Sequence, residues 1–509
     1  MKILLFLVAP LLLSASPKTP SDLTLTSTKD TVRLSWKDRA SNEHGFKIFR
    51  DGKLIALTSA NISTYTDRGL QPNRFYTYTI KATDDIPHGQ TIKHMGQVGS
   101  HNWGKLNHYG SMTTLDIGNN LAFGARSVKA TALNRGTIFA STDGSGELCS
   151  QSVPCSARSA FSKVKAGDVL FLRGGVYRID KTLIVKTSGE NNRPIVIESY
   201  PGEVATLDAG RINPEDVSKK WNDRVSGITL LDKMNYIYMR KLEIRNMGGA
   251  GIRVNGSYNK VEGCNIHNNF VGGIRVGDIL DWHEDRPFVD GYNIIKDNIV
   301  HDNSDVGLGG RSGNGGNSDG IWVGTGKHNR IIHNSVYANS DDGVDVWRSN
   351  DSYVAYNISY DNGIAGGDGN GFKLGGHYDK VNNALVLDSN IGLRSIAEYN
   401  IAYDNKANGF DYNTGLDVIM RYNTSYNNGK FGYVGCKLAR TEVSNNISSL
   451  DHAGPTHSRS DWGAFDSIDN SWDKNEDIKF ISVNPKSSKF LVPQNKTEFR
   501  RIGIYAKRK

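Results

Sequence analysis

Apolar and polar residues recur with a fixed period along the second half of the chain. The clearest unit is a six-residue string, Asn298-Ile299-Val300-His301-Asp302-Asn303. Its copies start at Asn298, Asn334, Asn357, Asn400 and Asn423, with weaker copies starting at Cys264 and Asn446. From Asn298 onward the starts differ by 36, 23, 43, 23 and 23 residues. A base period of 23 residues predicts stacked coils, because one coil is too short to bury its own apolar face. The repeat therefore predicts an all-β chain with a right-handed parallel β-helix of three short strands per coil.

The asparagines at the ends of the string predict a ladder of amide side chains at a turn, in which each bonds its copy in the next coil. This interpretation also covers the sequences Asn357-Ile358-Ser359 and Asn423-Thr424-Ser425, which have the pattern of a glycan acceptor. We interpret both asparagines as ladder residues and not as glycan acceptors.

A second element, glycine-apolar-X-apolar, follows most copies of the string. Examples are Gly273-Ile274-Arg275-Val276 and Gly371-Phe372-Lys373-Leu374. Side chains alternate across a strand, so the apolar residues are expected in the core and X on the outer surface. The predicted outward column runs Arg253, Arg275, Trp322, Asp345, Lys373, Arg394 and Asp411. This pattern alone fits a charged groove or a solvated face with an ion-pair ladder equally well.

The front of the chain has a different pattern. From about residue 20 to 85, short alternating strands are separated by turns, which predicts a small β-sandwich. The segment resembles a fibronectin type III module through Leu34-Ser35-Trp36, Leu70-Gln71-Pro72 and Tyr76. We expect this module over 20–117 and a linker over 118–136, and we assign neither any chemistry.

The first residues have the order of a secretory signal peptide. Lys2 precedes the apolar run Ile3 to Leu13, and small residues end with Ser16. We expect residues 1–16 to be removed and the protein to be secreted, extracellular or periplasmic. No other window approaches the roughly 18 apolar residues of a membrane span, so we expect a soluble protein with no membrane partner.

Export permits a disulfide, and the four cysteines divide into two kinds. Cys149 and Cys155 bracket a short polar stretch, which predicts a stapled loop. Cys264 and Cys436 lie inside strand-like segments, and we interpret them as buried free thiols. Cys-x-x-Cys and Cys/His zinc spacings are absent from the sequence.

The 509 residues carry a net charge of +8, which favours an acidic partner. The stretch from His301 to Gly376 departs from this balance, since it has nine Asp, no Glu and five Lys plus Arg. Four of its acids fall in two neighbouring turns: Asp319, Asp341, Asp342 and Asp345. Clustered carboxylates repel unless a cation lies among them, which predicts a Ca²⁺ site. The alternative, that Asp before Gly makes a turn, explains Asp319 and Asp342 but not Asp345.

At these residues the chain resembles polysaccharide lyase family nine, the pectate lyase type. The resemblance covers about 137–490 and leaves 491–509 as a tail; three motifs carry it: Asn317-Ser318-Asp319-Gly320, Ser340-Asp341-Asp342-Gly343-Val344-Asp345 and Gly369-Asn370-Gly371-Phe372-Lys373-Leu374-Gly375-Gly376. It implies a β-helix of about ten coils. It also implies that the four aspartates hold a catalytic Ca²⁺ and that Lys373 is the Brønsted base.

β-Elimination in a 4-linked uronate chain removes the proton on C5 and expels O4. The neighbouring carboxylate makes C5–H a very weak acid, so a cation that neutralises it stabilises the developing enolate. A nearby dication and Arg394 would favour neutral Lys373, whereas the carboxylates act in the opposite direction. Candidate substrate-binding residues are Arg275, Arg394, His377 and Trp322.

The predicted function is therefore a Ca²⁺-dependent lyase acting on an acidic polysaccharide, pectate above all, as a monomer without a nucleic-acid partner. Rhamnogalacturonan or another uronate or amino-sugar polymer is an alternative substrate. A β-helical glycoside hydrolase with paired Asp is a second alternative, although the Gly-His-Gly and Arg-Ile-Lys motifs of such hydrolases are absent. A third alternative is a non-catalytic carbohydrate-binding β-helix in which Ca²⁺ is structural.

Overall fold

A computed structural model describes residues 20–83, 113–114, 129–131 and 137–503. The first and last ranges contain short gaps, and the longer ones lie between 211 and 222 and at 278–290, 308–313, 388–391, 459–464 and 495–502. The expected signal peptide, residues 1–16, lies outside the described residues. The chain divides into two compact units, Met1–Arg135 and Gly136–Lys509, and each is described by itself.

The first unit contains two small antiparallel sheets around one apolar core. One sheet consists of β1 (Ser21–Ser27), β2 (Thr31–Lys37) and β5 (Thr64–Arg68). The other consists of β3 (Gly45–Arg50), β4 (Lys53–Ser59), β6 (Phe75–Thr83), β7 (Thr113–Thr114) and β8 (Lys129–Thr131). The alternating residues Val32, Leu34 and Trp36 are buried, so the period-two pattern is confirmed. Strand β8 falls in the segment that was expected to be a linker.

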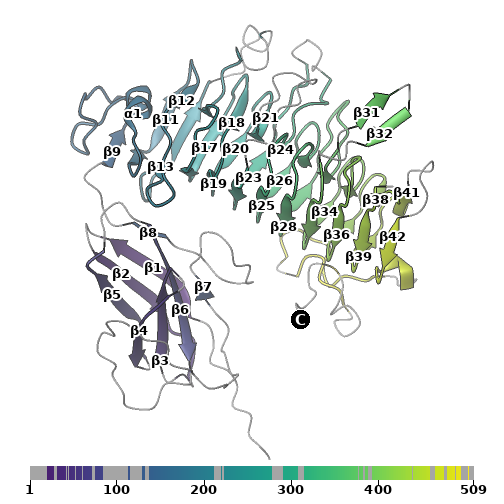
Figure 1. Cartoon of the computed structure of the whole chain (residues 1–509), viewed down its shortest axis with the longest axis horizontal. Helices are drawn as coiled ribbons and strands as arrows, with labels where there is room; N and C mark the ends of the chain where they lie inside the picture. The colour runs from purple at the N-terminus through teal and green to yellow at the C-terminus, as the bar shows by residue number, and fades with distance from the viewer. Residues whose placement is uncertain are drawn as a thin grey trace, which may run out of the picture. The chain divides into compact units, whose positions relative to one another are not determined.

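The second unit is a parallel β-helix of three sheets, which run side by side along the stack in Figure 1. Sheet A contains β9 (Thr137–Ala140), β10 (Val169–Leu172), β13 (Ile195–Ser199), β16 (Ile237–Arg240), β19 (Lys260–Glu262), β22 (Ile294–Lys296), β25 (Arg330–Ile332), β28 (Tyr353–Ala355), β33 (Ile396–Glu398), β36 (Ile419–Arg421), β39 (Glu442–Ser444) and β42 (Asp466–Ile468). Sheet B contains β11 (Gly175–Arg178), β14 (Ala205–Asp208), β17 (Leu242–Arg245), β20 (Asn265–His267), β23 (Ile299–His301), β26 (Ser335–Tyr337), β29 (Ile358–Tyr360), β34 (Ile401–Tyr403), β37 (Thr424–Tyr426) and β40 (Ile447–Ser449).

Sheet C contains β12 (Leu183–Val185), β15 (Ile228–Leu230), β18 (Ala250–Val254), β21 (Gly272–Val276), β24 (Ile321–Val323), β27 (Val344–Val346), β30 (Phe372–Leu374), β35 (Phe410–Asp411), β38 (Phe431–Gly435) and β41 (Gly454–Ser458). Sheets B and C have 10 strands each, which confirms about ten coils. A hairpin of β31 (Tyr378–Val381) and β32 (Ala384–Leu387) leaves the stack after β30, and a short helix η3 (Trp472–Lys474) follows β42.

Two ladders of buried amides run along the coils, one at each end of the six-residue string. In the first, Asn298 Nδ2 donates to Asn334 Oδ1 at 2.9 Å. Its members are Asn298, Asn334, Asn357, Asn400, Asn423, Asn446 and Asn470. The members of the second are Asn269, Asn303, Asn339, Asn362, Asn405, Asn428 and Asp451. The predicted ladder is confirmed, and Asn357 and Asn423 are buried within it.

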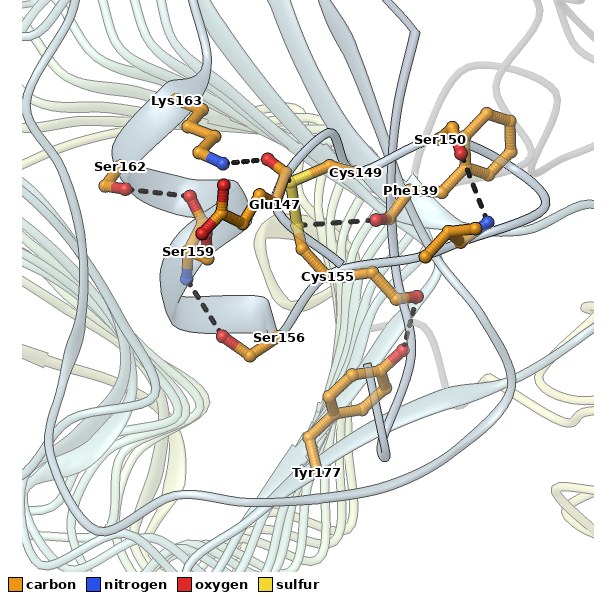
Figure 2. Close-up of a disulfide and its surroundings, with 12 residues drawn as sticks. Phe139, Glu147, Cys149, Ser150, Cys155, Ser156, Ser159, Ser162, Lys163 and Tyr177 are labelled. Atoms are coloured by element: carbon orange, nitrogen blue, oxygen red, sulfur yellow. Dashed lines mark hydrogen bonds between the residues drawn. A yellow bond between two sulfur atoms is a disulfide. The ribbon is translucent and has the colours of Figure 1, made fainter. Parts of the chain in front are cut away.

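Figure 2 shows a disulfide at the first coil, between Cys149 and Cys155. The bridged loop joins Phe139 of β9 by backbone hydrogen bonds from Phe139 N to Cys149 O and from Cys155 N to Phe139 O. Helix α1 (Ala157–Lys163) begins directly afterwards, with Ser156 as its N-cap. The loop and helix cover the apolar end of the stack. Cys264 and Cys436 are free and buried. Among the described residues, no helix is long and apolar enough to cross a membrane.

Removing this disulfide in the double variant C149S/C155S should lower the free energy of unfolding by about 2 kcal/mol, because the bridge closes a short loop. Thermal unfolding of the variant and the parent, followed by circular dichroism, measures the difference. The parent in a reducing agent is the control, because Cys264 and Cys436 are already free and reduction opens the Cys149–Cys155 bridge without changing the sequence. Equal unfolding temperatures for C149S/C155S and the parent would contradict a stabilising role for the bridge.

Candidate active site

The outward column of sheet C has the register that the glycine-apolar-X-apolar element predicts, with one exception. Arg253 pairs with Arg275, Arg275 with Trp322, Trp322 with Asp345, and Asp345 with Lys373. Neighbouring strands lie roughly 4.8 Å apart, so these side chains form a continuous row along the outer surface. The row brings Asp345 and Lys373 together from consecutive coils.

Arg394 is the exception, and its predicted place in the column is wrong. Lys373 pairs with Asp411 in the next coil, because the hairpin β31–β32 lengthens the interval and Arg394 falls in the turn before β33. Arg394 has a φ of 53°, which is incompatible with a strand. Its guanidinium donates two hydrogen bonds to Asp351, at 2.6 and 2.9 Å. Arg394 therefore belongs to a surface ion pair outside the column.

The turns before sheet C carry a third polar ladder, and two of its positions are aspartates. Asp342 N donates to Asp319 Oδ1 at 3.3 Å, and Asn370 donates to Asp342 Oδ1 through N at 2.7 Å and Nδ2 at 2.9 Å. Asn370 Oδ1 in turn accepts from Asn408 N and Nδ2. Asp319 and Asp342 thus occupy positions that asparagine fills in later coils. The substitution of Asp for Asn places two buried charges in consecutive coils.

Three carboxylates converge beside this ladder. Oxygens of Asp319, Asp342 and Asp345 lie within 4.8 Å of one another, and all three residues are buried. Asp341 and Asp342 form a second such group with Asp368. Of the four aspartates predicted to share one site, three therefore form one group, and Asp341 belongs to the adjacent group.

The buried group fits a hard divalent cation. Asp345 Oδ1 is buried and has no hydrogen-bond partner in the part of the chain that the structure describes. Burial and the neighbouring carboxylates raise the pKa of Asp319 well above its usual range. Burial is also the main cause that raises the pKa of Asp345 to about 8 and that of Asp341 to about 9. Carboxylate oxygens that repel one another, with Asp345 Oδ1 left without a partner among the described residues, suit the oxygen coordination that Ca²⁺ takes.

Lys373 lies against both acidic groups. Its Nζ is 2.9 Å from Asp342 Oδ2, 3.0 Å from Asp368 Oδ2 and 3.9 Å from Asp345 Oδ2. Burial favours the neutral amine, but the attraction of these carboxylates outweighs it and raises the pKa of Lys373 well above its ordinary value. In this arrangement Lys373 is an ammonium ion. A neutral Lys373 requires that another cation take up the negative charge of Asp342 and Asp345.

Asp368 and Asn370 are site residues that sequence reasoning missed. Both lie in the segment Gly367-Asp368-Gly369-Asn370-Gly371, which reads as a glycine-rich turn. For Asp368 the available signal was that it belongs to the same acidic stretch as Asp345, and for Asn370 it was the third motif of the resemblance.

The other predicted substrate-binding residues have different surroundings. Trp322 is only 6% exposed, and the guanidinium of Arg275 lies 3.9 Å from the centre of one of its rings. This cation–π pair is directly beside Asp345 in the column. Gly324 leaves space for the indole, since a Cβ there would lie 1.8 Å from Trp322. His377 lies outside the described residues.

We expect the acidic group to destabilise the metal-free protein as pH rises. The folded-state pKa values of Asp345 and Asp341, about 8 and about 9, exceed the ordinary aspartate pKa of 3.8. Their contribution to stability is therefore fully present below pH 3.8 and is lost as pH rises through these two values.

Differential scanning calorimetry in chelator should show a melting temperature that falls towards alkaline pH, and Ca²⁺ should remove most of this fall. The D345N variant in chelator should show a smaller decrease. A melting temperature that rises with pH in chelator would contradict the prediction.

The fold and site together define a parallel β-helix protein with an acidic group and a lysine in an outward column. The chain belongs to the Pel9A-like, right-handed beta-helix family, whose pattern matches residues 138–446, more than half of the chain. The family match also confirms the predicted hand of the helix.

Several relatives in the curated proteins are pectate lyases. Pectate lyase L of Paenibacillus polymyxa (strain SC2) is 26% identical over 280 residues, which are 50% of this chain and 54% of the relative. Pectate lyase PEL9 of Emericella nidulans is 28% identical over 397 residues, which are 68% of this chain and 86% of the relative. The chain spans about half the length of pectate lyase L of Paenibacillus polymyxa and of Dickeya dadantii.

Two solved structures share the fold. The crystal structure of pectate lyase Pel9A aligns with a TM-score of 0.55 at 22% identity, covering 70% of this chain and 89% of that one. A rhamnogalacturonan lyase aligns with a TM-score of 0.60 at 20% identity, covering 73% of this chain and 100% of that one.

Proposed function

We propose that this chain is a secreted, Ca²⁺-dependent polysaccharide lyase that cleaves a 4-linked uronate polymer, pectate above all, by β-elimination. One juxtaposition carries the proposal: Lys373 Nζ lies 2.9 Å from Asp342 and 3.9 Å from Asp345 in an outward column. The pectate lyases among its relatives support the substrate class.

Asp319, Asp342 and Asp345, with Asp341 beside them, would hold the cation. When bound there, Ca²⁺ would supply the positive charge that neutralises the uronate carboxylate and acidifies C5–H. With Asp342 and Asp345 bound to the cation, Lys373 would be a neutral amine, and its Nζ takes the C5 proton. The C–H electron pair becomes the C4–C5 double bond as the C4–O4 bond breaks, and O4 leaves with that bond's electron pair and takes a proton from water.

Arg275 and Trp322 extend the same row away from Lys373, and we propose that they contact the sugar next to the cleaved bond. A guanidinium suits a uronate carboxylate, because its planar N–H groups match both oxygens. His377, two residues after the strand of Lys373, stays a predicted binding residue. Arg394 also stays a predicted binding residue, with its guanidinium bonded to Asp351.

The remaining proposals concern export, the oligomeric state and the front unit. Residues 1–16 would direct export, and the enzyme would act as a monomer. The front unit would be a fibronectin type III-like module that spaces or docks the β-helix, because its two facing sheets hold an ordinary apolar core.

The test is a panel of polygalacturonate, rhamnogalacturonan and alginate, each with Ca²⁺ or chelator. A lyase produces an unsaturated uronide whose ultraviolet absorbance rises with time, and chelator should abolish the rise. Activity on another polymer alone would correct the substrate. New reducing ends without the chromophore would indicate a hydrolase, and binding without any product would indicate a non-catalytic β-helix.

A further inference from the structure

The loop between β29 and β30 is packed tightly against the turns of earlier coils. Gly366 N donates to Asn314 O at 2.7 Å. A Cβ on Gly367 would lie 1.8 Å from Ser340 O, so the backbone approaches at a distance that only glycine allows. This loop is therefore held against the coil that carries Asp341 and Asp342.

Three further hydrogen bonds fix the backbone at Asp368 and just before it. Lys406 Nζ donates to Ala365 O at 2.6 Å and to Gly367 O at 2.7 Å. Asp368 N donates to Asp341 Oδ1 at 2.7 Å. The carboxylate of Asp368 is thus carried on a rigid backbone, although its side chain is 65% exposed.

Asp368 differs from the other carboxylates that contact Lys373. Asp342 and Asp345 have side chains that are 0% and 9% exposed, and they belong to the buried group that fits a cation. Asp368 lies outside that group and reaches Lys373 Nζ at 3.0 Å from the solvent side. A cation bound at the buried group would engage Asp342 and Asp345. Among the described carboxylates that contact Lys373, this leaves Asp368 bonded to its Nζ.

We propose that Asp368 is a positioning residue: its carboxylate holds the Lys373 amine at the outer surface, where the substrate's C5–H arrives. The inference rests on the proposed function, since it assigns Lys373 the role of base. A hydrogen-bond acceptor at this position aims the Nζ lone pair, and a displacement of roughly 1 Å can cost about 100-fold in rate.

The variants D368A and D368N separate positioning from charge and from metal binding. D368A should lower kcat on polygalacturonate 10- to 100-fold, roughly, while KM stays within about threefold. D368N keeps an acceptor oxygen of the same reach and should recover most of kcat. Calorimetric titration with Ca²⁺ should give similar affinities for both variants and the parent. The control I364A removes an exposed side chain from the same loop and should match the parent.

Three outcomes would overturn the proposal. D368A with unchanged kcat would show that other contacts position Lys373. A loss of Ca²⁺ affinity in D368A would make Asp368 a metal ligand, and equal losses in D368N and D368A would make its charge the relevant property. The variant G367A, which displaces the loop, should reproduce the D368A effect. Failure of the proposed function is recognised separately, by full activity of a Lys373 variant.

Discussion

The variant K373M is expected to lose at least about 1000-fold in the rate of uronide formation, because general base catalysis contributes up to about 10⁴-fold. Methionine keeps the length of the side chain and removes the amine to which the proposal assigns the C5 proton. The measurement is the initial rate of ultraviolet absorbance on polygalacturonate at saturating Ca²⁺. Circular dichroism checks that the β-helix is retained.

Loss of Lys373 should also strengthen cation binding. Its ammonium lies 2.9 Å from Asp342 and 3.9 Å from Asp345, so it competes with Ca²⁺ for the same negative charge. Calorimetry should therefore give a lower Kd for Ca²⁺ in K373M than in the parent. If K373M is inactive and binds Ca²⁺ more tightly, the variant has lost the base and its metal site is intact.

Lys296 provides a matched control. Its side chain is 14% exposed against 15% for Lys373, and it also lies between two carboxylates, those of Glu262 and Asp297. It lies on sheet A, away from the outward column of sheet C. K296M should keep the parental rate. Full activity of K373M would remove Lys373 from the role of base.

The variant D345N is expected to weaken Ca²⁺ binding by at least about 100-fold, because even residues that only support a metal ligand cost 10- to 100-fold. Asp345 Oδ1 is buried and has no hydrogen-bond partner among the described residues, so the cation is its natural partner. The rate at low Ca²⁺ should fall in proportion and recover partly at high Ca²⁺. Calorimetric titration and the Ca²⁺ dependence of the rate measure both effects.

The same substitution should stabilise the metal-free protein. Burial raises the pKa of Asp345 to about 8, which means that the folded state resists its negative charge. A neutral amide of the same shape removes that cost, so D345N should melt at a higher temperature than the parent in chelator at alkaline pH. Lower stability of D345N under these conditions would contradict this account of the group.

Asp305 supplies the control for D345N. It is as buried as Asp345, and burial raises its pKa too, but Ser340 Oγ donates to its Oδ1 at 3.1 Å. It is absent from both carboxylate groups that could hold a cation. D305N should leave Ca²⁺ affinity close to the parental value. Equal losses in D305N and D345N would indicate general damage to these coils.

The register of Asp345 and Lys373 could be predicted because each lies in a regular copy of the repeat. One coil advances the stack by one strand spacing, so equal positions in consecutive copies must be neighbours. The same reasoning gave the wrong register for Arg394, because Lys373 pairs with Asp411. The copy with Arg394 lies inside the interval of 43 residues from Asn357 to Asn400, which also contains the hairpin β31–β32. Counting along the chain could not reveal that this hairpin leaves the stack.

Asp368 could not be predicted for a related reason. Its contact with Lys373 depends on glycines that let one loop approach the turns of earlier coils, and these contacts join residues such as Gly366 and Asn314, about two coils apart. A short glycine-rich segment is compatible with many loop conformations, so its local sequence carries no information about which side chain it presents to Lys373.

By itself, the sequence determined the β-helix, the amide ladders and the row that carries Asp345 and Lys373. These features follow from alternation and period, which are local properties repeated in each coil. Only the tertiary structure decided that Arg394 pairs with Asp351, that three of the four aspartates share one group, and that Asp368 joins Lys373. Those contacts depend on loops whose paths are set by packing between coils, and packing is a property of the assembled stack.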